Sequence, residues 1–275
     1  MIHSINFKGT LLSLDRPLIM GIINISPDSF YQGSTKSDLK SILDTSEKML
    51  KDGADIIDLG GMSSRPGALL ISEEEELKRL LSPVAEICKR FPKAILSIDT
   101  MRSRIANETI DAGAKCINDI SAGKFDHEMF RIVAGHKTPY IMMHMAGMPS
   151  DMQLNPTYND VVMDILKFFK DRIAKAQKEG IQDLIIDPGF GFGKTLEHNY
   201  TLLKNFEAFQ IFDIPLLAGI SRKSMIWKKL SITPENALNG TTALHMYLLQ
   251  KGASILRVHD VKEAIECIEL YRMLQ

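Results

Sequence analysis

Short apolar runs alternate along this 275-residue chain with longer segments of helical pattern. Eight of the runs stop abruptly at polar residues of the kinds that take part in chemistry. A continuous apolar run is typical of a parallel strand that is buried on both faces, so the polar residue marks where the strand leaves the core. The polar residues at the run ends are Asn24, Asp58, Asp99, Asn118 with Asp119, His144, Asp187, Ser221 with Arg222 and Lys223, and Arg257 with His259 and Asp260.

The segments between the runs have a helical pattern, and four of them finish at a glycine just before the next run. Glycine closes a helix at least cost because it adopts the left-handed conformation freely, so Gly53, Gly113, Gly180 and Gly252 mark helix ends. The predicted helices span residues 38–51, 72–90, 103–112, 127–135, 158–179, 196–209, 234–251 and 261–270.

Eight strands that alternate with eight helices predict an α/β protein with a parallel sheet. The chain is close to the ~250 residues typical of a (β/α)8 barrel, so we expect a single TIM-barrel domain over residues 1–275. The opening run at 2–14 is left over from this alternation. It predicts a short N-terminal β-hairpin that closes the bottom of the barrel.

Composition agrees with a soluble, enzyme-sized domain. The formal net charge is −1, which indicates neither a nucleic-acid partner nor an anionic membrane surface. No apolar stretch reaches the ~18 residues needed to span a bilayer, and residues 1–24 lack the order of a signal peptide, so we expect a cytoplasmic protein. Cys88, Cys116 and Cys267 lack CxxC spacing and are predicted to be buried free thiols.

In a closed barrel the polar strand ends converge on one rim, and active sites of such barrels lie at this C-terminal face. The predicted rim has two chemically distinct halves. Strands 7, 8 and 1 contribute a mainly cationic half, formed by Ser221, Arg222, Lys223, Arg257, His259 and Asn24. Strands 3, 4 and 6 contribute a half of hydrogen-bond acceptors, formed by Asp99, Asn118 and Asp187.

The cationic half predicts a phosphorylated ligand, because phosphate groups in these barrels commonly bind at strands 7 and 8. The amide oxygen of Asn24 is a hard ligand that suits Mg²⁺, so we expect the ion to arrive with a diphosphate. The acceptor half fits a heterocycle with adjacent N–H groups, such as a 2-amino-pyrimidinone edge. Taken singly, each residue is more often a strand-end turn or a helix N-cap, but the whole set is not explained in that way.

Two further features have plainer interpretations. The glycine-rich run at 189–194 lacks the spacing of a phosphate-binding P-loop, so we interpret it as a loop of close backbone approach after strand 6. His144, at the end of strand 5, is interpreted as a structural hydrogen-bonding residue rather than a base.

Five loop motifs, in order along the whole chain, resemble the signatures of the dihydropteroate synthase family. They are NISPDSF at 24–30, DLGGMSSRPG at 58–67, DPGFGFGK at 187–194, SRK at 221–223 and RVHD at 257–260. The resemblance implies a homodimeric pterin-binding barrel that joins 6-hydroxymethyl-7,8-dihydropterin diphosphate to p-aminobenzoate, giving 7,8-dihydropteroate and pyrophosphate. It also implies a transferase of folate synthesis that sulfonamides block.

Carried over position by position, the resemblance assigns ligand contacts to individual residues. The metal and the diphosphate would meet Asn24, and the diphosphate would also meet Arg257 and His259. The pterin edge would meet Asp99, Asn118, Asp187 and Lys223, with Met142 on the pterin floor. The aminobenzoate pocket would involve Ser64, Arg65, Phe192 and Ser221. The catalytic residues are expected to be Asp99, Lys223, Arg257 and His259.

The chain departs from the family pattern at three loop positions. Ser26 and Ser64 replace threonine but keep a hydroxyl group, whereas Met62 replaces the usual glutamate and puts in doubt any role for a charge there. Two alternatives to a dihydropteroate synthase remain open. A methyltetrahydrofolate-type pterin methyltransferase domain would share the acceptor half but would have no diphosphate to hold, and an inactive pterin-binding paralogue is indicated only by Met62.

Overall fold

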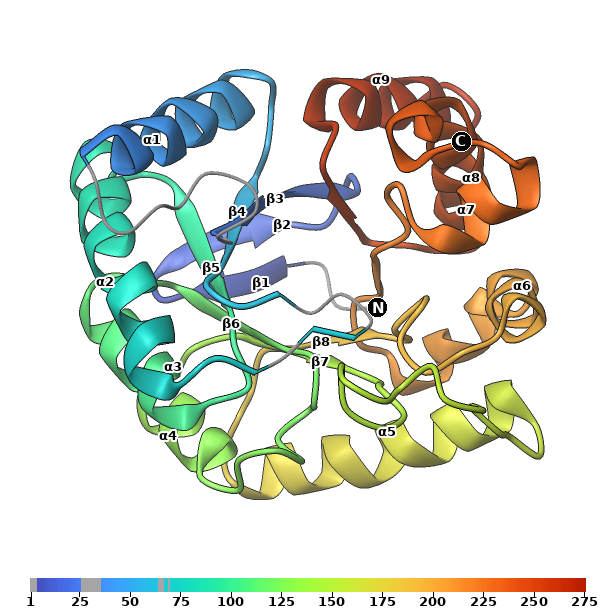
Figure 1. The fold of residues 1–275 in the computed structure, drawn as a ribbon, viewed down its shortest axis with the longest axis horizontal. Coiled ribbons are helices and arrows are strands. Elements are labelled where there is room, and N and C mark those ends of the chain that lie inside the picture. Colours follow the sequence, from blue (N-terminus) through green and yellow to red (C-terminus); the bar gives the residue numbers. More distant parts are fainter. Residues whose placement is uncertain (1–3, 26–35, 64–66, 69) are drawn as a thin grey trace.

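The computed structural model describes residues 4–25, 36–63, 67–68 and 70–275, and it forms a barrel of parallel strands surrounded by helices (Figure 1). The strands of the barrel pair in the order β8-β7-β6-β5-β4-β3-β10-β9. Their bounds are β3 Leu18–Asn24, β4 Ile56–Gly60, β5 Ile95–Asp99, β6 Cys116–Asp119, β7 Tyr140–Met143, β8 Leu184–Asp187, β9 Leu217–Ala218 and β10 Ile255–Val258. This eight-stranded parallel sheet confirms the predicted (β/α)8 TIM-barrel class.

The barrel closes between β8 and the chain that leads into β9. Leu216 forms a parallel bridge with Ile186, and the Ile186 N–H donates to the carbonyl of Pro215 at 3.1 Å. Strand β9 has only two residues, and the chain then passes into the loop that carries Ser221 and Lys223. The short strand therefore delivers this loop directly to the rim.

A helix overlaps every predicted helical window, with ends that differ by a few residues. The helices are α1 Lys36–Lys51, α2 Glu73–Arg90, α3 Ser103–Asp111, α4 Met129–Gly135, α5 Val161–Lys178, α6 Leu196–Lys204, α7 Ser224–Leu230, α8 Leu238–Gln250 and α9 Val261–Arg272, with 3₁₀ segments η1 Phe206–Phe212 and η2 Pro234–Asn236. The windows at 196–209 and 234–251 each divide into an α-helix and a 3₁₀ segment. Helix α7 was not predicted, because its seven residues are too few to establish a helical period.

The predicted helix ends have the expected backbone conformation. Gly53, Gly113, Gly180 and Gly252 have φ values of 105°, 116°, 99° and 88°. At Gly113 a Cβ atom would also lie 3.0 Å from Cys88 Sγ, a tight contact that adds to the preference for glycine from φ. The glycine signals of the sequence are thus confirmed.

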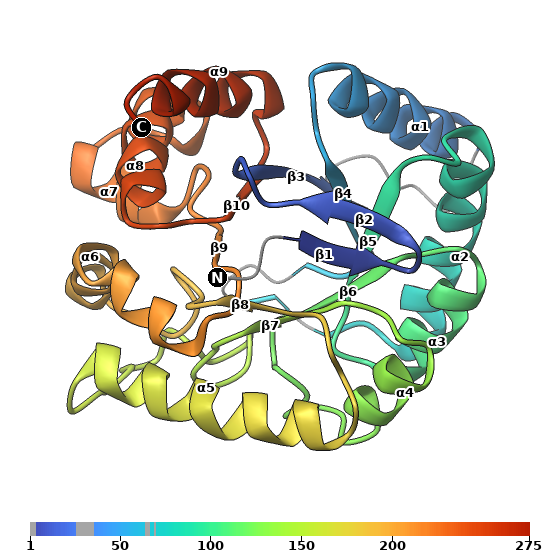
Figure 2. The same cartoon turned by 180° about the vertical axis from the view of Figure 1, so that it is seen from behind.

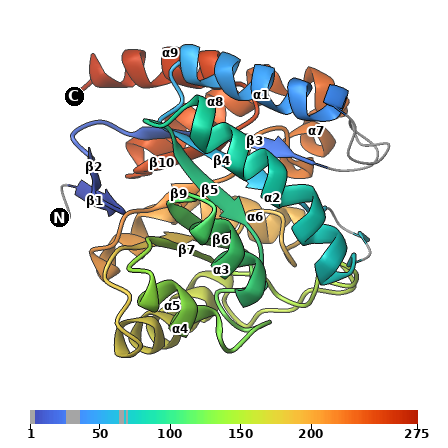
Figure 3. The same cartoon turned by 90° about the vertical axis from the view of Figure 1, so that its left-hand side faces the viewer.

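The N-terminal hairpin is formed by β1 Ser4–Phe7 and β2 Thr10–Ser13, which pair antiparallel. Its buried side chains, Ile5 and Phe7, pack against inward-facing residues of the barrel strands. The partners in this inner cluster are Leu18, Met20, Ile56, Ile95, Cys116, Ile141, Ile185, Leu217 and Ile255. Figure 2 shows the hairpin lying across the opening of the barrel, and Figure 3 shows it at the end away from α7. The predicted closure of the barrel bottom is confirmed.

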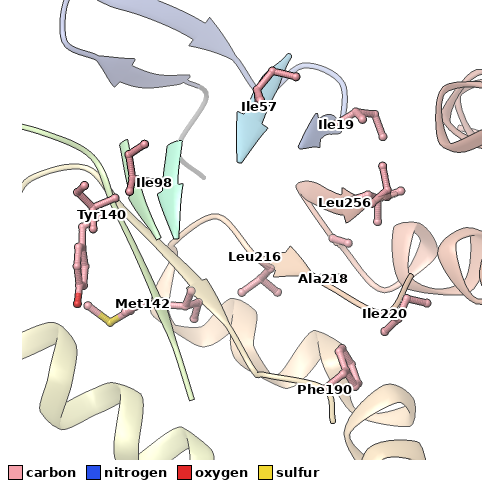
Figure 4. Packing of buried hydrophobic residues seen from close by; sticks show 14 of the residues in the cluster. Ile19, Ile57, Ile98, Tyr140, Met142, Phe190, Leu216, Ala218, Ile220 and Leu256 are labelled. Carbon is pink, nitrogen blue, oxygen red and sulfur yellow. The ribbon is translucent and has the colours of Figure 1, made fainter. Parts of the chain in front are cut away.

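A larger apolar cluster fills the space between the strands and the helices. It includes alternate strand residues, such as Ile19, Ile57, Ile98, Tyr140 and Leu256 (Figure 4). Because successive side chains of a strand point to opposite faces, their neighbours in the sequence face the barrel interior.

The predicted free thiols are present, with Cys116 and Cys267 buried and Cys88 partly buried. Among the helices of the described residues, no helix is long and apolar enough to cross a membrane.

Candidate active site

Strand alternation brings several of the predicted residues into the interior of the barrel. Ile56, Cys116, Ile185 and Ile255 belong to the inner apolar cluster. The residue two positions further along each of these strands shares the same face and lies nearer the C-terminal end. These residues are Asp58, Asn118, Asp187 and Arg257. The polar groups therefore stand directly above an apolar base.

Arg257 is the centre of an ion-pair network. Its Nε donates to Asp58 Oδ2 at 2.7 Å, and its Nη2 donates to Asp99 Oδ2 at 2.7 Å. Asn118 Nδ2 donates to the same oxygen of Asp58 at 3.0 Å. Burial disfavours the charge, but the two carboxylates more than compensate and raise the pKa of Arg257 above its usual value. The guanidinium is therefore a fixed positive charge with a defined orientation.

Asp58 was underestimated in the sequence analysis, which placed it at a strand end but in neither half of the rim. Its side chain is fully buried, and one oxygen receives hydrogen bonds from both Arg257 and Asn118. Within the described part of the chain, its other oxygen has no hydrogen-bond partner. The signal in the sequence was its position, since Asp58 lies two residues after the inward-facing Ile56 on the same strand.

Asp99 lies at the rim end of β5, where it shares Arg257 with Asp58. Burial raises the pKa of Asp99 to about 7, the positive charge of Arg257 opposes this shift, and the negative charge of Asp58 adds to it. The carboxyl group is therefore divided between its two protonation states at neutral pH. A ligand that donates hydrogen bonds would favour the ionised form.

Lys223 and Asp187 lie near each other and near Arg257, around Gly219. Lys223 Nζ donates to the carbonyl of Phe190 and lies 4.7 Å from the centre of the Phe192 ring. Burial lowers the pKa of Lys223 to about 8, opposed by Asp187, and burial raises the pKa of Asp187, opposed by Lys223. A Cβ atom at Gly219 would lie 3.6 Å from Asp187 Oδ2 and 3.8 Å from Lys223 Nζ, so glycine leaves space around both groups.

Ser221 and His259 are joined at the rim. The Ser221 hydroxyl accepts a hydrogen bond from the His259 backbone N–H at 3.2 Å, and it lies 3.0 Å from Nδ1 of the same histidine. Burial of part of its side chain, with the positive charge of Arg257 nearby, lowers the pKa of His259 to about 4. The residue as a whole is exposed at the rim. At neutral pH the imidazole is therefore uncharged.

Arg222 does not join the cationic half, and this expectation was wrong. Its Nε and Nη2 donate to the two carboxylate oxygens of Asp260 at 2.7 and 2.8 Å. Its Nη1 donates to the carbonyls of Pro234 and Glu235. These bonds direct the Arg222 side chain to Asp260 and tie the β9–α7 loop to the start of α9.

Asn24 ends β3 at the rim, where it is exposed. It pairs in register with Gly60, which pairs with Asp99, and a Cβ atom at Gly60 would lie 3.4 Å from Asn24 Oδ1. Among the described residues, no group of three or more histidine, cysteine, aspartate or glutamate side chains could hold a metal ion. The amide oxygen of Asn24 is a hard donor of the kind that Mg²⁺ accepts.

The remaining predicted residues differ in their placement. The Phe192 ring lies beside Lys223 in an apolar rim cluster with Met62, Met101, Ile120, Met143, Met145 and Met152. Met142 belongs instead to the cluster that faces the helices, because it alternates with the inward-facing Ile141 and Met143 (Figure 4). The structure thus places Met143, rather than Met142, at the barrel mouth. Ser64 and Arg65 lie outside the described residues.

His144 is buried, and its Nδ1 atom lies 3.0 Å from Lys194 Nζ. Its ring also makes an edge contact with Phe168, with the ring centres 4.8 Å apart. The histidine thus packs among other side chains of the protein, as a structural hydrogen-bonding residue would.

Comparison with known proteins identifies the family. A model of pterin-binding enzymes matches residues 20–259. The chain belongs to this pterin-binding family. It is 42% identical over 265 residues to the dihydropteroate synthase of Escherichia coli (strain K12), covering 96% of this chain and 93% of that protein.

Solved structures of the family have the same fold. A Yersinia pestis dihydropteroate synthase with a sulfonamide drug complex superposes with a TM-score of 0.92 at 40% identity, over 98% of each chain. The Xanthomonas albilineans enzyme with 4-aminobenzoic acid gives a TM-score of 0.92 at 35% identity, over 100% of this chain and 99% of that one. The same enzyme with 7,8-dihydropteroate gives 0.88 at 33% identity, over 99% and 98%. The predicted resemblance, the dihydropteroate synthase function and the transferase class are confirmed.

Proposed function

We propose that this chain joins 6-hydroxymethyl-7,8-dihydropterin diphosphate to p-aminobenzoate, giving 7,8-dihydropteroate and pyrophosphate. One observation carries the proposal beyond family membership. The fixed cation Arg257 lies inside the barrel between Asp58 and Asp99, with Asn118 on the same network. A site with an oriented guanidinium and several carboxyl acceptors suits a flat heterocycle rich in N–H groups that carries an anionic substituent.

The pterin ring is expected to occupy the interior of the barrel. Asp187 and Asn118 would accept hydrogen bonds from the pyrimidinone edge. The ionised carboxylate of Asp99 would accept a hydrogen bond from a ring N–H. Lys223 would donate to the pterin carbonyl, and the planar guanidinium of Arg257 would stack on the ring.

The diphosphate is expected at the rim, where Ser221, His259 and Asn24 lie. Loss of a diphosphate from a methylene on an electron-rich dihydropterin leaves a delocalised cation, so we propose a dissociative displacement. Arg257 and His259 would hold the leaving group and stabilise its developing negative charge. Bound Mg²⁺ would add positive charge to the diphosphate, and Asn24 would be its protein ligand.

The second substrate is an arylamine, which is neutral at physiological pH and can attack once it is held in line. We propose that p-aminobenzoate binds near Phe192 and Ser221, together with Ser64 and Arg65, and that sulfonamides compete for this place. The solved relatives with 4-aminobenzoic acid and with a sulfonamide drug support this choice of ligands. Binding would be ordered, with the pterin diphosphate first, and tight binding of p-aminobenzoate to the free enzyme in calorimetry would contradict that order.

We further propose a cytoplasmic homodimer whose single domain covers residues 1–275. An apolar groove of about 520 Å³ runs between α8 and α9, and Leu270, Met273 and Leu274 expose large apolar side chains at the end of α9. A second copy of the chain would bury this surface. Light scattering would show a dimer for the wild type and a shift to monomer for Leu270→Glu.

The decisive assay mixes the protein, Mg²⁺, the pterin diphosphate and p-aminobenzoate and follows 7,8-dihydropteroate and pyrophosphate. Formation of both products is expected. Intact pterin binding without product would indicate the inactive paralogue, and transfer of a methyl group from a methyltetrahydrofolate would indicate the methyltransferase. The pairing of Ser221 with His259 beside Arg257 favours the synthase, because a methyltransferase has no diphosphate to hold.

A further inference from the structure

The glycine-rich loop 189–193 is held almost entirely by side chains. Its five consecutive backbone carbonyls each accept a hydrogen bond from a side-chain donor. The donors are Lys194 to Gly189, Lys223 to Phe190, Gln153 to Gly191, Lys194 to Phe192 and Tyr158 to Gly193. A loop without ladder hydrogen bonds needs such partners when it is buried. Its conformation therefore depends on the residues that supply them.

Lys194 supplies two of these five bonds from a buried position. Its Nζ lies 2.8 Å from the carbonyl of Gly189, 3.0 Å from the carbonyl of Phe192 and 3.0 Å from His144 Nδ1. The residue is only 3% exposed, and Lys and other charged residues are rarely buried to this extent. The pterin-binding assignments above give it no role.

Lys194 Nζ also lies 3.4 Å from the His144 carbonyl, and its three shorter contacts persist in either protonation state. Burial lowers the pKa of Lys194 well below its usual value, opposed by Asp187, and burial likewise lowers the pKa of His144. An ammonium would donate to both carbonyls and to Nδ1. A neutral amine would donate to both carbonyls and accept from Nδ1–H, since imidazole can carry its proton on either nitrogen.

The loop is also pressed onto the chain after β7. A Cβ atom at Gly189 would lie 2.0 Å from the carbonyl oxygen of His144, and one at Gly193 would lie 2.3 Å from that of Ala146. Both glycines have positive φ values, 73° and 64°. Lys194 and His144 thus join two backbone segments that already touch.

The same loop determines the surroundings of Lys223. The carbonyl of Phe190 accepts from Lys223 Nζ, and the Phe192 ring lies beside that ammonium at 4.7 Å. Lys194 donates to the carbonyls of Gly189 and Phe192, which lie on either side of Phe190 in the loop. It therefore fixes the loop on both sides of the Lys223 contact.

We propose that Lys194, clamped to His144, is a positioning residue that acts through loop 189–193 to place the ammonium of Lys223 for binding the pterin diphosphate. The proposal rests on the function proposed above, because Lys223 is taken to meet the pterin. Lys194 itself does not touch the ligand. Its loss should weaken binding only as far as Lys223 contributes to binding.

A double-mutant cycle tests this dependence. The dissociation constant of 6-hydroxymethyl-7,8-dihydropterin diphosphate is measured by calorimetry for the wild type, Lys194→Met, Lys223→Met and the double variant. We expect Lys194→Met to weaken binding about tenfold, because the buried Phe192 carbonyl loses its donor and the Gly189 carbonyl keeps only the Phe192 backbone N–H at 3.2 Å. In the Lys223→Met background the same change should have little further effect, since coupled residues are not additive. Equal, additive losses in the two backgrounds would overturn the proposal.

Variants of His144 provide a second route should Lys194→Met fail to fold. His144→Asn keeps an acceptor near the Nδ1 position and should bind like the wild type, whereas His144→Leu removes it and should resemble Lys194→Met. Lys115→Met is a matched control, because Lys115 Nζ donates to Thr10 Oγ1 of the hairpin, at the opposite end of the barrel, at 3.4 Å. A loss of melting temperature without any change in pterin binding would assign Lys194 a purely structural role.

These outcomes separate the two proposals. A wild-type protein that binds the pterin diphosphate but makes no dihydropteroate would contradict the proposed function and leave the cycle interpretable. A fully active wild type with additive variants would contradict only the role of Lys194.

Discussion

The two ends of the barrel interior are built by the same strands with opposite chemistry. On β4 the inward-facing residues are Ile56 and then Asp58, and on β10 they are Ile255 and then Arg257. The distance between such residues is only about 6–7 Å along a strand. Below Asp58 and Arg257 the interior is closed by apolar side chains and the hairpin, and at their level and above it is lined by polar and charged groups.

The apolar base explains why the upper groups behave as they do. Water cannot reach the charged layer from below, so the ion pairs of Arg257 lie in a medium of low dielectric constant. The same burial shifts the pKa of Asp99 to about 7 and that of Lys223 to about 8. The lower end therefore contributes stability, and the upper end contributes ionisable groups whose pKa values are shifted towards neutrality. Substitutions at the two ends should separate stability from activity.

The largest expected effect is on stability at the lower end. Phe7→Ala should lower the free energy of unfolding by about 3–5 kcal/mol, because it empties a fully buried site in the plug of the barrel. Denaturant unfolding measures the change. The folded fraction should keep its KM values for both substrates. Leu11→Ala in the same hairpin is the control, since Leu11 is 67% exposed and its loss should change little. A Phe7 variant with normal stability would show that the hairpin does not support the barrel.

The complementary effect is on activity at the upper end. Arg257→Lys keeps the positive charge but cannot bond Asp58 and Asp99 with a planar fork, so kcat/KM should fall by about 10²–10³-fold. The melting temperature should change far less than in the Phe7 variant. Lysine is the better substitution for this test, because alanine would leave Asp58 buried without its partner. Near-normal turnover in Arg257→Lys would mean that charge alone, not orientation, matters at this position.

Local features of the fold could be predicted from the sequence, whereas features that depend on distant residues could not. The barrel was predictable because apolar runs, helical periods and terminal glycines such as Gly113 are local signals. Asn118 and Asp187 were predictable because they end runs. Asp58 was underestimated because its importance depends on Arg257, almost two hundred residues away, and Met142 was misplaced because strand register decides which of two adjacent methionines faces inward.

Arg222 shows a further limit. In sequence it stands between two rim residues and has the right charge, but its backbone has φ of 53° and its side chain points to Asp260. A left-handed residue in a short loop cannot be inferred from composition. Helix α7 was missed for a related reason, since one short helix has no period to detect.

A smaller effect is expected on the pH dependence of stability, through Asp99 in the upper layer. The pKa of Asp99 is about 7 in the folded protein against about 3.9 in an unfolded chain, so the folded state holds more protons between these values. Stability from this group is therefore lost as pH rises from about 4 to about 7. Asp99→Asn removes this loss, so its melting temperature relative to the wild type should be higher at pH 8 than at pH 4. An unchanged difference across this range would show that Asp99 is already ionised in the free protein.

The smallest expected effect concerns His259 at the exposed edge of the upper layer. Its pKa of about 4 leaves it neutral in the free protein at pH 7. A bound diphosphate would raise this pKa, so the complex would hold more protons, and affinity should rise as pH falls from the pKa of the complex towards 4. Calorimetry with pyrophosphate from pH 5 to pH 8 would show this in the wild type, with a gain of up to about tenfold for each unit by which the pKa rises. His259→Gln should flatten the profile, and the difference between the two proteins removes the protonation of pyrophosphate itself. Parallel profiles would place the diphosphate away from His259 and leave the oriented Arg257 as its main partner.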